Sequence, residues 1–290
     1  MELNYNSAAS LKAFLDANGL GMRKKFGQNF LINPNARQAL AEALEAREGE
    51  AVWEIGPGLG AMTRILLQKG LSVRAFEIDP GFVRALKKIF ANDSGFTLIE
   101  GDALKTWPAQ PPAPYLLGNL PYNIGAALLA DFIENGLFFR RAVVTVQREV
   151  AQRMAAGAGS ANYSSFSVLC ASAYRVKQLM LIKGASFYPK PNVDSQGVLL
   201  ELRGDAGAGR PACFYPLVRQ LFCARRKTIK NNLAGFFARR GKQSGTGPAQ
   251  TAELATELLA KCAIDGGLRA ENLRVDDFAA LAQAIEDMRY

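Results

Sequence analysis

Short apolar runs alternate with longer amphipathic stretches between residues 51 and 203, a pattern that predicts a parallel sheet flanked by helices. The expected strands are Ala51–Ile55, Ser72–Phe76, Phe96–Glu100, Pro114–Gly118, Ala142–Gln147, Leu179–Gly184 and Gln196–Leu202. The expected helices are Asn35–Glu45, Ala61–Lys69, Phe82–Phe90, Ile124–Glu134 and Tyr163–Ala173. This region therefore reads as one α/β domain.

The pattern changes after a flexible Gly/Ala-rich hinge at residues 204–209, beyond which the apolar spacing is purely helical. The expected helices there are Phe214–Cys223, Lys227–Phe237, Ala252–Cys262 and Val275–Met288. The sequence thus predicts two domains, an α/β domain over 1–203 and a small all-α domain over 204–290.

Composition narrows the possible partners and chemistry. Lys and Arg outnumber Asp and Glu by 35 to 26 in 290 residues, a net charge of +9 that favours a nucleic acid over an acidic membrane surface. No apolar run is long enough to cross a bilayer, and four scattered cysteines indicate reduced thiols, so we expect a cytoplasmic protein. Histidine is absent, which excludes a histidine base or metal ligand.

A glycine-rich loop, Gly56-Pro57-Gly58-Leu59-Gly60, follows the first expected strand and opens a helix. Glycines there allow the backbone to approach a ligand closely. The loop alone also fits a dinucleotide site or a simple tight turn.

Carboxylates end the next two strands and favour a nucleoside cofactor. Glu77 lies where an acid accepts hydrogen bonds from ribose hydroxyls, and Asp102 suits an adenine amino group. Strand-end acids can also be helix caps, which we prefer for Asp79 before Pro80. With the loop, the two acids are similar to the S-adenosylmethionine site of Rossmann-like methyltransferases.

The segment Gly118-Asn119-Leu120-Pro121-Tyr122 follows the fourth strand and so lies at the same sheet edge. The Asn119 amide oxygen and the Leu120 carbonyl can accept the two hydrogens of an exocyclic amine, and Tyr122 can stack on the base. Such chemistry needs no dedicated base, and a base inside a duplex must be flipped out to reach it. The alternative is a simple turn.

A second candidate for the acceptor pocket is the stiff, proline-containing loop from Ser186 to Ser195. Phe187 in this loop can cover the other face of the target base. A hairpin with a core phenylalanine is a serious alternative for that residue.

Together these motifs resemble the ribosomal RNA adenine dimethyltransferase family, in particular its small-subunit members, from about Lys24 to Phe278. The matching segments also include Phe26–Leu31, the Phe187–Ser195 loop and Arg225–Leu233. The resemblance implies that S-adenosylmethionine is held by Asn29, Leu31, Gly56, Glu77, Asp102 and Asn119, and that Asn119, Leu120, Pro121, Tyr122 and Phe187 form the catalytic site. It further implies dimethylation of two adjacent adenosines in the 3′-terminal hairpin of small-subunit rRNA, within an immature subunit. We also expect a monomer that holds no metal.

Basic residues crowd the segment from Arg219 to Lys242, which contains eight Lys or Arg and no acid. A charge run is often only a solvated helix face, but this one is unopposed within its segment, so we expect it to contact RNA phosphates. The candidate contacts are Arg225, Arg226, Lys227 and Lys230, with Arg23-Lys24-Lys25 as a smaller patch.

Three alternative functions remain open at this stage. A large-subunit rRNA methyltransferase of the resistance type shares the cofactor and acceptor motifs. An RNA-binding assembly factor would use the basic segment without catalysis as its main role. A nicotinamide oxidoreductase would explain the glycine loop but not the acceptor motif.

Overall fold

The computed structural model describes residues 3–21, 28–204, 206, 210–240 and 247–288. It divides into two compact units. Unit 1 comprises residues 1–151 and 174–203, and unit 2 comprises residues 152–173 and 204–290. The segment 152–173, which the sequence pattern placed in the first domain, therefore packs with the helical second unit.

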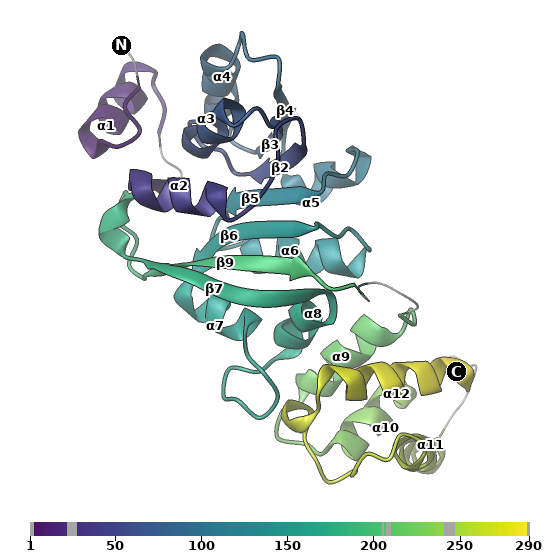
Figure 1. Cartoon of the computed structure of the whole chain (residues 1–290). Helices are drawn as coiled ribbons and strands as arrows, with labels where there is room; N and C mark the ends of the chain where they lie inside the picture. Colours follow the sequence, from purple (N-terminus) through teal and green to yellow (C-terminus); the bar gives the residue numbers. More distant parts are fainter. Residues whose placement is uncertain (1–2, 22–27, 205, 207–209, 241–246, 289–290) are drawn as a thin grey trace. The chain divides into compact units, whose positions relative to one another are not determined.

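Unit 1 is built on a seven-stranded sheet in the order β4-β3-β2-β5-β6-β9-β7 (Figure 1). The strands are β2 (Ala51–Ile55), β3 (Ser72–Glu77), β4 (Phe96–Glu100), β5 (Tyr115–Asn119), β6 (Arg141–Gln147), β7 (Tyr174–Ile182) and β9 (Ser195–Leu202). The ladders from β4 to β6 are parallel, and β9 runs antiparallel to both of its neighbours. The expected Rossmann-like α/β fold is confirmed, with one antiparallel strand added.

The helices of unit 1 include several that begin at a residue whose side chain caps them. They are α1 (Ala8–Ala17), α2 (Pro34–Glu42), α3 (Ala61–Gln68), α4 (Pro80–Ile89), α5 (Ala103–Thr106) and α6 (Gly125–Glu134), followed by α7 (Arg148–Met154) where the chain passes into unit 2. Asp79 accepts hydrogen bonds from the backbone N–H groups of Gly81 and Phe82, with Pro80 in the first turn of α4. Asp79 is thus the helix cap that its sequence context predicted.

Apolar residues on both faces of the sheet form the core of unit 1. Trp53 on β2 is fully buried and meets the rings of Phe76, Phe132 and Phe139 at centroid distances of 4.9 to 6.2 Å. Because aromatic pairs in such tilted geometries add to ordinary burial, this cluster fixes β2 rigidly beneath the loop that follows it.

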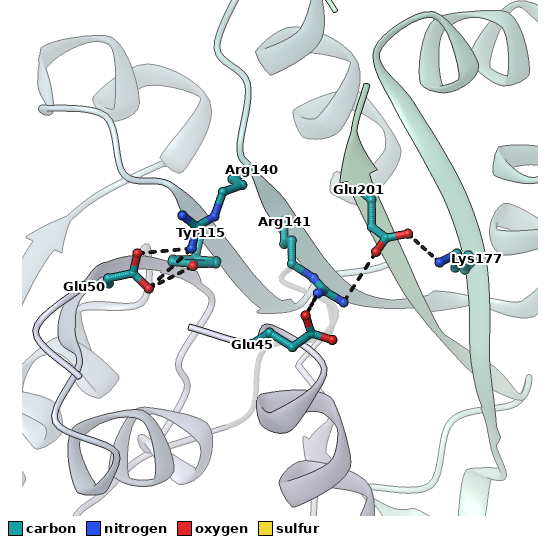
Figure 2. Close-up of polar contacts among 7 residues, drawn as sticks. All are labelled: Glu45, Glu50, Tyr115, Arg140, Arg141, Lys177 and Glu201. Atoms are coloured by element: carbon teal, nitrogen blue, oxygen red, sulfur yellow. Dashed lines mark hydrogen bonds and ion pairs between the residues drawn. The ribbon is translucent and has the colours of Figure 1, made fainter. Parts of the chain in front are cut away.

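The polar network at the edge of the sheet where β5 and β6 begin consists of two separate groups of paired side chains (Figure 2). The members are Glu45, Glu50, Tyr115, Arg140, Arg141, Lys177 and Glu201. Glu50 accepts from the Tyr115 hydroxyl at 2.8 Å and from Arg140 at 3.1 Å, and Arg141 lies between Glu45 and Glu201. Ion pairs of this partly exposed kind contribute at most about 1 kcal/mol each, so the network is a modest stabilising element opposite the carboxyl ends of the parallel strands.

Unit 2 is helical and has its own core. Its helices are α8 (Ser165–Ala173), α9 (Phe214–Cys223), α10 (Ile229–Arg240), α11 (Pro248–Lys261) and α12 (Val275–Asp287). Tyr163, Phe214, Phe237 and Phe278 are buried together in a single apolar cluster. The Tyr163 hydroxyl donates to the Leu273 carbonyl at 3.0 Å, which fastens the segment before α8 to the C-terminal part of the unit.

Two features of unit 1 lie outside the predicted elements. Helix α1 precedes the first expected helix and buries Leu11 and Leu15 against Leu59 and Phe82. A two-stranded antiparallel ladder joins β1 (Phe30–Leu31) to β8 (Phe187–Tyr188). Strands of two residues are too short to show an alternation of apolar and polar residues in the sequence.

Candidate functional site

A cavity lies in unit 1 at the carboxyl ends of β2 to β5, the sheet edge that the motifs indicated. Its lining comes from the segment before β1, the glycine loop, the ends of β3 and β4, and the acceptor motif. The described lining residues are Gln28, Asn29, Phe30, Leu31, Arg37, Glu54, Ile55, Gly56, Pro57, Gly58, Ala61, Met62, Phe76, Glu77, Ile78, Phe82, Gly101, Asp102, Ala103, Asn119, Pro121 and Ile124. All six residues assigned to the cofactor thus line one cavity.

The glycine loop needs glycine at Gly58 for two reasons. Its φ is +60°, and a Cβ there would lie 2.9 Å from the Phe30 ring. Phe30 in turn meets Phe82 at 5.6 Å between ring centroids. The loop backbone is therefore packed directly against an aromatic wall of the cavity, with no room for a side chain.

Glu77 is held at the end of β3 by backbone donors on both of its oxygens. The Asp79 N–H donates to Oε1 at 2.8 Å and the Gly58 N–H donates to Oε2 at 3.2 Å. Only 4% of the residue is exposed, and burial raises the pKa of Glu77 to about 7. Each oxygen keeps a lone pair, so the oriented carboxylate can also accept from a ligand hydroxyl.

Asp102 is both a helix cap and an acid of the cavity lining, the two roles considered for strand-end acids. Its Oδ1 accepts from the Leu104 N–H at 3.1 Å and caps α5, while the residue also lines the cavity. One carboxylate oxygen is used by the cap, and the side chain still has acceptor capacity for an amino group.

Glu54, near the end of β2, is a buried acid that also faces the cavity. It is 3% exposed, accepts from the Thr63 hydroxyl at 2.6 Å, and lines the cavity. Burial is the main cause that raises the pKa of Glu54 to about 7, and the nearby Glu77 carboxylate adds to it. Two neighbouring acids with raised pKa values give the cavity floor a strongly polar character.

Asn119 ends β5 at the cavity wall, and its amide is oriented by the backbone. Its Nδ2 donates to the Asn29 carbonyl at 2.7 Å, so its Oδ1 is the acceptor left for a ligand. No described residue donates to that oxygen. Next to it, the Leu120 N–H donates to the Thr145 carbonyl at 3.1 Å and fixes the start of the acceptor loop to β6.

Tyr122 and Phe187 lie outside the lining of this cavity. The Tyr122 hydroxyl and the Ser195 hydroxyl are 2.5 Å apart, and burial raises the pKa of Tyr122. Phe187 is 3% exposed and packs in an apolar cluster with Leu31 and Leu40. Its position therefore favours the alternative of a core phenylalanine.

The segment before α1 contributes contacts that no motif indicated. The Tyr5 hydroxyl donates to the Leu59 carbonyl of the glycine loop at 2.9 Å. Arg37 on α2 donates to the carbonyls of Tyr5 at 3.2 Å and Leu31 at 2.6 Å, and to the Asn6 side chain. The available signal in the sequence was an arginine at a helical position next to the apolar Ala36, Leu40 and Ala41.

The described part of the basic segment lies in unit 2, over the end of α9, the connection that follows it, and α10. Arg226, Lys227 and Lys230 are exposed and have no acidic partner among the described residues. Arg225 pairs with Glu271 at 2.9 Å and donates to the Tyr163 carbonyl at 3.3 Å. The charge run is thus unopposed in its own segment, but one member meets an acid from later in the chain.

Some predicted features lie outside the described residues, namely Phe26 and Gly27 of the N-terminal motif, Arg23-Lys24-Lys25 and Lys242. Within the described ranges, no helix has the length and apolarity to cross a membrane. Nor do three or more acidic, cysteine or histidine side chains in those ranges gather in a way that could hold a metal ion.

Comparisons with known proteins agree on one family. The model of the ribosomal RNA adenine dimethylase family matches residues 19–283. The ribosomal RNA small subunit methyltransferase A of Treponema denticola is 43% identical, over 97% of this chain and 96% of that protein. A crystal structure of a dimethyladenosine transferase from Plasmodium falciparum superposes with a TM-score of 0.74 at 26% identity, covering 88% of this chain and 96% of that one. The 23S rRNA methyltransferase ErmE shares the fold, with a TM-score of 0.62 at 21% identity, covering 88% of this chain and 99% of that one.

Proposed function

This chain belongs to the ribosomal RNA adenine dimethylase family, and we propose that its targets are the two adjacent adenosines of the 3′-terminal hairpin of small-subunit rRNA. It is an S-adenosylmethionine-dependent enzyme that dimethylates adenine N6 in small-subunit rRNA. The proposal extends to its setting, a monomer acting in the cytoplasm on an immature subunit. Support comes from the near full-length similarity to small-subunit methyltransferases.

The structural observation that supports an adenine amine as the acceptor is the orientation of Asn119. Because its Nδ2 is committed to the Asn29 carbonyl, its Oδ1 is presented as an acceptor at the wall of the cavity. An adenine amine needs such an acceptor, since its lone pair is delocalised into the ring and its nitrogen is a poor nucleophile. Accepting one N–H at Asn119 and the other at the Leu120 carbonyl draws the nitrogen toward a tetrahedral, nucleophilic state.

The cavity also fits the cofactor. Glu77 and Asp102 provide oriented carboxylate oxygens, and the remaining walls are largely apolar. We assign Glu77 to the ribose hydroxyls, Asp102 to the adenine amino group, and Asn29, Leu31 and Gly56 to the neighbouring walls. When bound, S-adenosylmethionine supplies an electrophilic methyl group to the amine.

Tyr122 is assigned to the face of the target base. Its hydroxyl is tied to Ser195, which is fully buried at the start of β9 and paired with both β6 and β7. This contact fixes the direction of the ring. A fixed ring can stack on the flipped base and stabilise the positive charge that develops on the amine.

The reaction does not require a side chain of this protein to accept the proton. The methylated amine is cationic and strongly acidic, so it can release its proton to solvent. This account agrees with a chain that has no histidine. Rate enhancement then comes mainly from positioning the amine and from electrostatic stabilisation.

The alternatives differ in how far the findings support them. Family membership removes the nicotinamide oxidoreductase. The likeness to the 23S rRNA methyltransferase shows the shared fold alone, while the relatives at 37–43% identity are small-subunit methyltransferases. A checkpoint role in assembly is compatible with the enzyme, because binding and methylation use different residues.

The test is to map the methylated positions on immature small subunits after reaction with labelled S-adenosylmethionine. We expect two adjacent dimethylated adenosines in the 3′-terminal hairpin. Immature large subunits serve as the control. Methylation of large subunits alone, or of single scattered adenosines, would refute the proposed target.

A further inference from the structure

Arg37 is the one basic residue among the described residues that line the cavity, beside three acids, Glu54, Glu77 and Asp102. It is 4% exposed, so its charge is almost completely removed from water. The cost of burying an unpaired guanidinium is several kcal/mol, on the order given for buried ions in general. A residue in this position therefore calls for an explanation.

The contacts of Arg37 within the protein do not neutralise its charge. They are two backbone carbonyls, of Tyr5 and Leu31, and the side chain of Asn6. No carboxylate among the described residues forms an ion pair with it, and its Nε is buried without a hydrogen-bond partner. Burial accordingly lowers the pKa of Arg37 from its usual value.

The carbonyl and amide contacts have a second effect, which is to hold the guanidinium still. Three acceptors from two chain segments fix its plane on α2, next to Leu31 of β1. A fixed cation that is removed from water interacts more strongly with an anion than a mobile surface cation does. The missing partner is then most simply supplied by the ligand.

The acidic residues and Arg37 suit different polar groups of the cofactor. The carboxylates suit its hydroxyl and amino groups, which donate hydrogen bonds. Its α-carboxylate is the only anionic group it carries, and the described lining offers one cation to meet it. We propose that Arg37 recognises the α-carboxylate of S-adenosylmethionine and so distinguishes the cofactor from analogues that lack this group.

The inference relies on the proposed function only for the identity of the cofactor. Its test is a binding measurement without turnover, by isothermal titration calorimetry. The two ligands are S-adenosylmethionine and decarboxylated S-adenosylmethionine, which keeps the sulfonium and the amine. We expect the unchanged protein to prefer the first ligand by about 10- to 100-fold, the usual worth of a hydrogen bond to a charged group.

The decisive variant is Arg37→Gln, which keeps an N–H donor for the Leu31 carbonyl but removes the charge. It should lose most of the preference by weakening the binding of S-adenosylmethionine alone. Arg37→Lys should keep part of the preference. Because the preference is a ratio measured on one folded sample, partial unfolding of a variant does not alter it.

Two control variants test whether Arg37 recognises the carboxylate or only supports the structure of the cavity. Asn6→Ala removes a contact of Arg37 but keeps the charge, so the preference should persist. Arg64→Gln removes a cation that lies beside Tyr5 and outside the cavity lining, and should leave the ratio unchanged. Equal loss of both ligands in Arg37→Gln, or no loss of either, would overturn the inference and assign the carboxylate to backbone N–H groups of the glycine loop. Failure of the unchanged protein to bind S-adenosylmethionine would count against the cofactor assignment itself.

Discussion

The orientation of single side chains in the site is determined by hydrogen-bond partners far away in the sequence. Asn119 is oriented by the carbonyl of Asn29, 90 residues earlier, and Tyr122 by Ser195, 73 residues later. The motif identifies which residue types are present, but these two contacts decide which atoms are left to meet a base. Mutations at the partners are therefore as informative as mutations in the motif.

Replacing Asn119 by Ala should reduce methylation by at least about 100-fold, by analogy with the loss of one preorganised hydrogen-bonding group. Binding to the immature subunit should stay nearly unchanged, because the basic segment is intact. Methyl transfer and subunit binding are measured separately on the same variant. Asn123→Ala in the exposed part of the same loop is the matched control, and an equal loss of binding and activity would contradict the role of Asn119.

Ser195→Ala should lower kcat about 3- to 10-fold, the usual worth of one neutral hydrogen bond, while the KM for S-adenosylmethionine stays constant. Tyr122→Phe should act similarly. A double-mutant cycle makes the measurement specific, since the two changes remove the same contact and the double variant should be no worse than either single one. Additive losses would show that Ser195 does not act through Tyr122.

At the scale of elements, the sequence predicted the strands of the sheet within a few residues, because each carries a strong apolar run. β7 begins at Tyr174, five residues before the expected Leu179, since its exposed residues hide the pattern. β1 and β8 were missed because two-residue strands exist only through their mutual pairing. The role of Arg37 and the packing of α1 likewise depend on tertiary contacts that no local pattern contains.

The basic residues in the connection between α9 and α10 can be tested in separate variants for their contribution to RNA binding. Replacing Arg226 and Lys227 by Ala should weaken RNA binding and reduce its salt slope by about one unit per lost phosphate contact. Arg225→Ala should change the slope less, since Arg225 already pairs with Glu271. The affinity is measured over a series of salt concentrations.

Glu271→Ala is the matched control for this prediction, because it releases Arg225 from its acidic partner. If Arg225 is mainly structural, the control leaves RNA affinity close to that of the unchanged protein. A clear rise in affinity would instead show that Arg225 is held back from RNA by Glu271.

At the scale of the whole molecule, the division into units explains what the sequence could and could not predict. The hinge after Arg203 was visible as a change of composition. The transfer of residues 152–173 to unit 2 was not, because α8 has the same apolar character whichever core it joins. Domain membership of such a helix is decided by packing partners and not by its own periodicity.

The buried acids of the cavity should make stability depend on pH. The pKa of Glu54 is raised to about 7 in the folded protein, above its ordinary value of 4.5. The folded state therefore holds this proton more tightly than the unfolded state, and the resulting stabilisation is complete below pH 4.5 and lost as pH rises through about 7. Glu77 contributes in the same direction.

Glu54→Gln removes this dependence and keeps an acceptor for Thr63. We expect the cofactor-free variant to gain on the order of 1–3 kcal/mol over the unchanged protein at pH 8, and much less at pH 5. Thermal unfolding at the two pH values measures the difference. The same gain at both pH values would show that ionisation of Glu54 is not the cause.

The ladder between β1 and β8 has a consequence for the order in which the protein is made. Asn29 and Leu31 lie in or beside a strand whose ladder partner, among the described residues, is at Phe187 and Tyr188. During synthesis, the strands that carry the glycine loop and both strand-end acids emerge first and can pair with one another. The N-terminal wall of the cavity forms its ladder only after β8 has emerged, so we expect a nascent chain to complete the proposed cofactor site after about two-thirds of its length has left the ribosome.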